Sequence, residues 1–86
     1  MNKMRRTALA SIKEKIEELK DELETLLEEE EEYRDNIPEN MQSGERYEKA
    51  DEAVSALEDA VSDLENAVDN IDTAMEYGRR IMNDEK

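Results

Sequence analysis

The 86-residue sequence has no cysteine, no histidine, no phenylalanine and no tryptophan. The lack of cysteine excludes a disulfide framework. Without cysteine and histidine, the chain has no thiol nucleophile, no imidazole base and no ordinary ligand set for zinc, haem or iron–sulfur clusters. A di-iron bundle of the Glu-x-x-His type is excluded for the same reason. We therefore predict a protein that is not an enzyme and that holds no metal and no cofactor.

Other chemical and targeting motifs are also missing. There is no glycine-rich phosphate loop and no Gly-x-Ser-x-Gly elbow, and Asp69–Asp72 lacks the glycine and the final glutamate of a calcium loop. Paired carboxylates could serve glycoside hydrolysis, but that chemistry needs a cleft that two helices do not provide. No run approaches the roughly 20 apolar residues of a membrane span or the apolar core of a signal peptide. We expect a cytoplasmic protein.

Charged residues make up 44% of the chain. There are 26 acidic and 12 basic residues, and the net charge is −14. Such a surface repels nucleic acid and anionic membranes and attracts basic proteins, so we expect a basic protein as a possible partner and no direct binding of nucleic acid or membrane. High charge with only 36% apolar residues is also typical of disorder, but a disordered chain has no reason to keep a regular apolar period.

That period is clearest between Ala53 and Met75, which repeat a heptad three times and enter a fourth. Three columns of residues seven apart run through it: Ala53, Ala60, Ala67 and Ala74; Val54, Val61, Val68 and Met75; Leu57, Leu64 and Ile71. The pattern predicts a long helix with a wide apolar stripe. Gly78 falls where the leucine column continues, and we expect a weak point there because glycine disfavours helix by about 1 kcal/mol.

A first helix is predicted over residues 4–34, a loop over 35–44 and a second helix over 45–82. The apolar stripe of the first helix consists of Leu9, Ile12, Ile16, Leu19, Leu23, Leu26 and Tyr33. Pro38 ends the first helix, Ser43 is the expected N-cap of the second, and Ile37 and Met41 are expected to fold back over the seam. A connection this short favours an all-α, antiparallel two-helix hairpin of coiled-coil type, forming one domain over residues 1–86.

The second helix carries three apolar columns, while a two-helix seam uses two. We therefore expect a homodimer that forms a four-helix bundle, which would also help so small a domain to bury apolar surface. The candidate oligomer interface comprises Ala53, Val54, Leu57, Ala60, Val61, Leu64, Ala67, Val68, Ile71 and Ala74. The alternative is that this face is kept for a different protein.

The charge is unevenly distributed. Residues 21–76 carry a net charge of −18, and the remaining residues carry +4. A candidate acidic binding face lies along one column of the second helix, namely Asp51, Glu58, Glu65 and Asp72. Our main hypothesis is a non-enzymatic protein-interaction module. The alternative is an acidic nucleic-acid mimic that occupies the basic groove of a DNA- or RNA-binding protein such as a host defence nuclease. Binding of DNA through the basic terminal end is opposed by the overall charge.

Three segments resemble small acidic proteins of prophages and mobile elements of Gram-positive gut bacteria. They are the Ile-Pro-Glu-Asn turn at Ile37–Asn40, the Glu-Arg-Tyr-Glu start of the second helix at Glu45–Glu48, and the heptads over Ala53–Ala74. The first helix is also glutamate-rich, as in that group. The resemblance implies a bacterial or phage cytoplasmic setting, and no functional residues follow from it.

Overall fold

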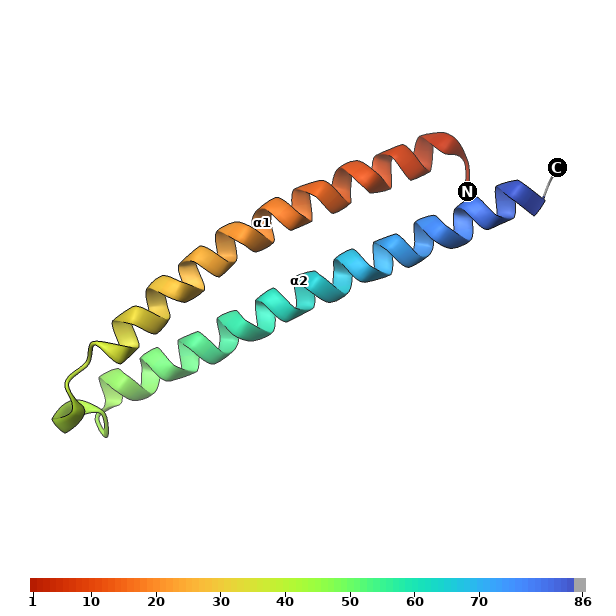
Figure 1. The fold of residues 1–86 in the computed structure, drawn as a ribbon. Coiled ribbons are helices and arrows are strands. Elements are labelled where there is room, and N and C mark those ends of the chain that lie inside the picture. Colours follow the sequence, from red (N-terminus) through yellow and green to blue (C-terminus); the bar gives the residue numbers. More distant parts are fainter. Residues whose placement is uncertain (85–86) are drawn as a thin grey trace.

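The computed structural model describes residues 1–84, and their side chains up to residue 80. It is a hairpin of two long α-helices, α1 at Lys3–Asp35 and α2 at Glu45–Asp84, joined by a loop that contains the 3-10 turn η1 at Glu39–Met41. Both termini lie at one end, which we call the open end, and the loop lies at the other (Figure 1). The predicted all-α hairpin is confirmed, with every helix boundary within two residues of that expected.

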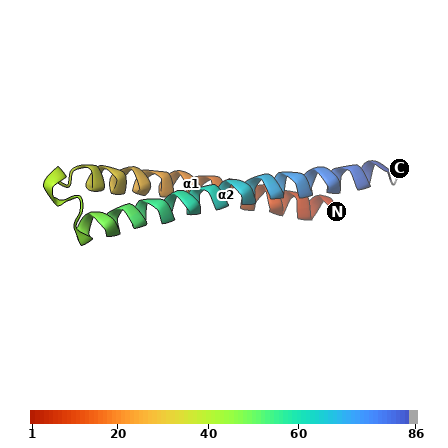
Figure 2. The same ribbon diagram turned by 90° about the horizontal axis from the view of Figure 1, so that it is seen from below.

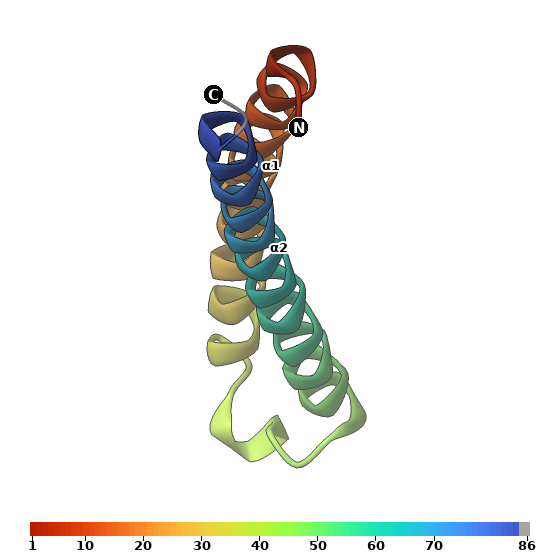
Figure 3. The same cartoon turned by 90° about the vertical axis from the view of Figure 1, so that its right-hand side faces the viewer.

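The hairpin is a thin rod. Its principal extents are 69 × 16 × 12 Å. Figures 2 and 3 show α1 and α2 crossing each other along their length instead of running straight side by side. A strict seven-residue repeat is slightly shorter than two turns of a straight α-helix, so two helices that keep their apolar columns in contact must wind around each other.

Local interactions explain where the helices begin and end. The Asn2 side chain accepts a hydrogen bond of 2.8 Å from the backbone N–H of Arg5 and so caps α1. Pro38 follows Ile37 and keeps that residue out of helical geometry. At the start of α2, the backbone N–H of Glu48 donates to the carbonyl of Gly44 at 3.2 Å. Gly44 therefore occupies the cap position, and the expected capping by Ser43 is wrong by one residue.

The best-buried apolar side chains gather at the loop end. Among the described residues these are Ile37, Ala50 and Val54, which are only 3%, 4% and 1% exposed. The Gln42 side chain holds the loop by donating a hydrogen bond of 3.2 Å to the Ile37 carbonyl. The expected fold-back of Ile37 is confirmed, whereas Met41 stays 48% exposed. Two helices alone bury a seam and not a broad core, so the loop residue Ile37 completes the best-buried apolar cluster among the described residues.

Gly78 is buried near the open end. A Cβ atom at Gly78 would lie 2.7 Å from the Met1 Cβ, closer than such atoms pack, so Met1 closes over the helix backbone there. Figure 1 shows the N-terminal segment turning towards α2. The sequence predicted a weak point in the helix at Gly78. In the structure, the absence of a side chain at Gly78 leaves the space that Met1 occupies.

Only part of the predicted stripe of α1 lies in the seam. Leu9, Ile16 and Leu23 are half-buried. A second apolar column remains exposed by 44 to 56%, namely Ile12, Leu19, Leu26 and Tyr33. The column on the other side of the central one is half-buried instead, and it contains Lys13, Lys20, Leu27 and Arg34. In α1, cations with long aliphatic stems therefore take seam positions that the sequence pattern assigned to leucine.

Candidate functional site

A row of ion pairs runs along one side of the seam, and we call this side the ion-pair flank. Lys13 Nζ lies 2.7 Å from Asp72 Oδ1, Lys20 Nζ lies 3.5 Å from Glu65 Oε1, and Arg34 Nη1 lies 3.0 Å from Asp51 Oδ1. The donors stand on α1 at multiples of seven residues, and the acceptors stand at multiples of seven on α2. Each heptad column therefore meets its counterpart across the hairpin.

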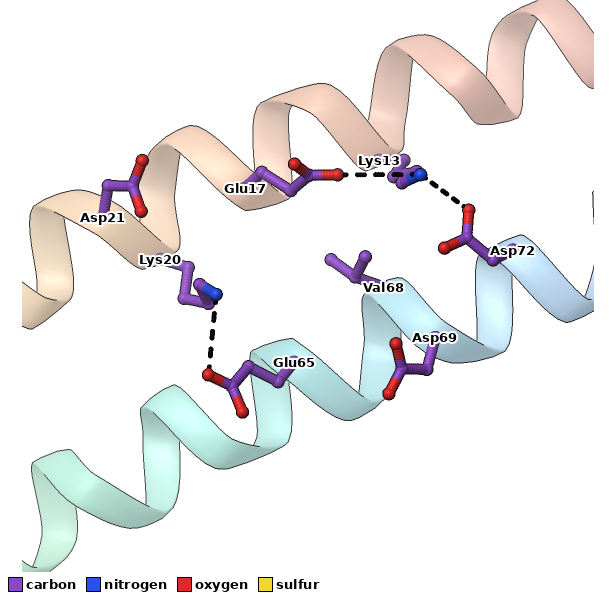
Figure 4. A pocket seen from close by; sticks show the side chains of 8 residues that line it. All are labelled: Lys13, Glu17, Lys20, Asp21, Glu65, Val68, Asp69 and Asp72. Atoms are coloured by element: carbon purple, nitrogen blue, oxygen red, sulfur yellow. Dashed lines mark ion pairs between the residues drawn. The ribbon is translucent and has the colours of Figure 1, made fainter.

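The ion-pair flank has a shallow hollow of about 350 Å³ between α1 and α2. Lys13, Glu17, Lys20 and Asp21 line it from α1, and Glu65, Val68, Asp69 and Asp72 line it from α2 (Figure 4). Glu17 also lies 3.8 Å from Lys13. The two lysines are thus engaged by carboxylates on both helices. Five acids line the hollow against these two lysines, so it keeps a net charge of −3.

The chemistry of this hollow is that of a structural ion pair. The hydrogen bond to Asp72 raises the pKa of Lys13 above its ordinary value of 10.5, against a smaller opposing effect of desolvation. A lysine nucleophile or base needs a lowered pKa, so Lys13 stays protonated and unreactive at neutral pH. The pKa of Arg34 is also raised, first by its hydrogen bond to Asp35 and then by Asp51. The geometry offers charge pairing and no acid–base or nucleophilic group.

The raised pKa of Lys13 gives a testable pH dependence. A group whose pKa is higher in the folded state stabilises that state fully below its unfolded-state pKa and loses this effect as pH rises through the folded pKa. We therefore expect Lys13→Met to lower the free energy of unfolding at pH 8 and to have a smaller effect at pH 11. Urea unfolding followed by circular dichroism at both pH values measures this difference. Lys3→Met is the matched control because Lys3 is exposed and makes no ion pair with another described residue. An equal effect of Lys13→Met at both pH values would contradict the assignment.

The acidic column is therefore engaged within the chain, although its paired side chains stay about half exposed. Three of its members, Asp51, Glu65 and Asp72, pair with cations of α1. The fourth, Glu58, stands opposite Leu27 in the same seven-residue series, and it makes no ion pair with another described residue. The sequence puts these four residues on one column, and α1 supplies counter-charges for three of them at the same spacing. The lysine and arginine spacing in the first helix was the available signal.

The two arginines of α2 at the basic end are also paired within the chain. Arg79 Nη1 lies 3.5 Å and Arg80 Nε lies 3.4 Å from carboxylate oxygens of Glu76. The Arg80 guanidinium additionally lies 5.6 Å from the centre of the Tyr77 ring. The arginines near the end of α2 therefore stabilise their own helix, and the structure gives them no arrangement suited to a phosphate.

The opposite side of the seam is apolar, and we call it the apolar flank. Ile12, Leu19, Leu26 and Tyr33 of α1 are exposed there. At about 100° per residue, this column and the lysine column stand on opposite sides of the central column of Leu9, Ile16 and Leu23. On α2 the acidic column and the alanine column also stand on opposite sides of the seam. Because the acidic column borders the ion-pair flank, the alanine column must border the apolar flank. Its members Ala53, Ala60, Ala67 and Ala74 are half-buried.

The structure changes the composition of the predicted interface. Val54 is buried inside the hairpin, so it has no area to offer a second chain, and its place in the candidate interface is wrong. The other nine candidates on α2 are half-buried. The sequence assigned the surplus apolar column to α2 alone, but the most exposed large apolar side chains on this flank belong to α1. The pattern of α1 alone could not show which two of its columns would face α2.

Within the described part of the chain, no three acidic side chains converge where they could hold a metal ion. No described helix is both long and apolar enough to cross a bilayer.

Comparison with known protein families, with curated proteins and with solved structures found no match to this chain. The resemblance to small acidic prophage proteins thus stays a prediction, and the candidate site is assigned from geometry alone.

Proposed function

We propose that this protein is a non-enzymatic interaction module that binds another helical protein surface along its apolar flank. One observation carries the proposal: Ile12, Leu19, Leu26 and Tyr33 form a continuous column at seven-residue spacing and remain about half exposed. Coiled-coil packing uses two such columns, and here the alanine column of α2, which borders the same flank, stands beside the exposed column of α1. Scattered exposed apolar residues are ordinary on protein surfaces, but four in register along one helix form a patch.

The distribution of charge supports the same surface. On the ion-pair flank, Lys13, Lys20 and Arg34 are already paired within the chain, so binding there would have to compete with existing pairs. On the apolar flank, Tyr33 accepts a hydrogen bond of 2.8 Å from Arg46 Nε at the loop end. Burying the rest of the exposed column removes leucine and isoleucine from water without breaking a polar contact. Burial of apolar area contributes about 25 cal/mol per Å², so this side has the larger binding energy to offer.

A site-specific photo-crosslinker tests the proposal. A photoreactive phenylalanine analogue placed at Leu26 in cells that naturally express the protein should form covalent adducts with a partner chain. The same analogue at Asp69 on the ion-pair flank is the matched control and should form few. Adducts with a second copy and adducts with another protein both support an interaction module. No adducts from Leu26, or equal adducts from both positions, would overturn it.

The nucleic-acid mimic remains a second proposal with narrower support. It rests on the exposed acids Glu28, Glu29 and Glu32 near the loop end of α1. It no longer has a free acidic column, since Asp51, Glu65 and Asp72 are paired within the hairpin. A mimic should compete with DNA for a basic protein with a steep salt dependence, and Glu28→Gln, Glu29→Gln and Glu32→Gln together should weaken that competition. Competition that is unchanged in this variant would exclude it.

A further inference from the structure

We infer that the occupant of the apolar flank is a second copy of this chain, placed with its loop at the opposite end of the bundle. This inference rests on the proposed function and specifies its partner. In the resulting dimer, α1 packs antiparallel against α1 of the second copy, and α2 packs against α2 of the second copy. A single two-fold axis perpendicular to the rod relates the copies.

The exposed column of α1 is complementary to itself in this arrangement. Its four members are evenly spaced, so a two-fold axis between Leu19 and Leu26 places Leu19 of one copy against Leu26 of the second copy. The same axis places Ile12 against Tyr33 of the second copy. When two antiparallel α1 helices pack through this column, the four exposed side chains of each copy become buried. The alanine columns of the two α2 helices then face each other, and alanine allows their backbones to approach closely.

Charge selects this orientation over the one with both loops at the same end. Residues 20–65, the loop half of the hairpin, contain 18 acids and 4 bases, and the other residues contain 8 of each. The whole net charge therefore resides in the loop half. Loops at the same end would set one strongly acidic half against the other. Loops at opposite ends set each acidic half against a neutral half, which avoids that repulsion.

The charges on α1 itself agree with this choice. Residues 3–20 of α1 contain six bases and three acids, and residues 21–35 contain nine acids and one base. An antiparallel pair of α1 helices brings the basic half of each against the acidic half of the other, with Lys15 near Glu29 of the second copy. Glu22 lies close to the axis and meets its own equivalent, which is the one like-charge contact that the arrangement creates. With loops at the same end, residues 21–35 of α1 would instead lie along the acidic first half of α2 of the second copy.

Two single-cysteine variants test the inference, because the chain has no cysteine of its own. Glu22 and Ser43 are both exposed. Glu22→Cys stands beside the proposed axis and should form an intermolecular disulfide on mild oxidation. Ser43→Cys stands in the loop, and the two loops would lie far apart on a rod 69 Å long, so it should form at most one tenth as much. Adding Leu19→Gln and Leu26→Gln to Glu22→Cys should reduce the disulfide at least tenfold.

The possible results distinguish the orientation of the dimer, the second copy as occupant, and the interaction module itself. A disulfide from Ser43→Cys and none from Glu22→Cys would show loops at the same end and overturn the orientation. A monomer by light scattering at about 100 μM, with neither disulfide, would overturn the second copy as occupant. In that case, adducts from Leu26 to a different protein would still uphold the interaction module, and their absence would remove both.

Discussion

Replacing Val54 by Asp should unfold the hairpin. Val54 is only 1% exposed, and no cation lies on its column in α2. An uncompensated buried charge costs about 3 to 5 kcal/mol, and a domain this small has a total stability of about that size. We therefore expect most of the helical circular dichroism signal at 222 nm to be lost at 25 °C, together with the cooperative thermal transition.

Ala56→Asp is the matched control for that experiment. It adds the same negative charge two residues further along α2, at an exposed position. It should leave the helical signal unchanged and shift the melting temperature by only a few degrees, as surface substitutions generally do. If both variants melted alike, the buried contact at Val54 would not be the basis of the stability of the loop end.

The second large effect concerns the apolar flank. Leu19→Gln with Leu26→Gln should convert the proposed dimer to a monomer that keeps its helices. Each leucine is a little over half exposed in the single hairpin, and burying that remainder contributes about 1 kcal/mol. Two leucines in each of two copies amount to about 4 kcal/mol, or roughly a thousandfold in the dissociation constant. Sedimentation equilibrium over a range of concentrations measures this shift.

Glu18→Gln with Thr25→Gln is the control for the flank. These exposed positions keep the seven-residue spacing on α1 but stand about 100° away around the helix. The control should associate at least as well as the parent chain, because it removes one negative charge and no apolar contact. Equal weakening by both pairs of substitutions would mean that association does not depend on the leucine column.

How far the sequence predicts the structure depends on the type of signal. The two helices and the loop follow from heptads interrupted once, at Pro38, and their boundaries are correct to within two residues. The burial of Ile37 also follows, since an isolated apolar residue beside the turn has only the end of the seam to cover. These features depend on local pattern, and the local pattern of this chain is regular.

The orientation of α1 about its own axis does not follow from its sequence alone. Leucine and isoleucine occupy two adjacent columns, and apolar periodicity ranks both as seam positions. The deciding information lies on α2, where Asp51, Glu65 and Asp72 attract Arg34, Lys20 and Lys13 and so turn the lysine column inward. The charge match between the two helices at heptad spacing therefore indicates the orientation of α1 better than the hydropathy of α1 does. Similarly, the role of Gly78 depends on Met1, which is far away in sequence.

The repeat distance of the ion-pair flank has a consequence for the length of the molecule. If α2 slid by seven residues, Lys13 would meet Glu65 and Lys20 would meet Glu58, while Arg34 would meet Gly44 and lose its partner. The two lysine pairs therefore do not choose the alignment of the two helices. The loop does, because Ile37 and its partners at that end occur once and do not repeat. The loop therefore sets the alignment of the two helices. Adding seven residues to each helix together would extend the rod by about 10 Å and leave every existing contact in place.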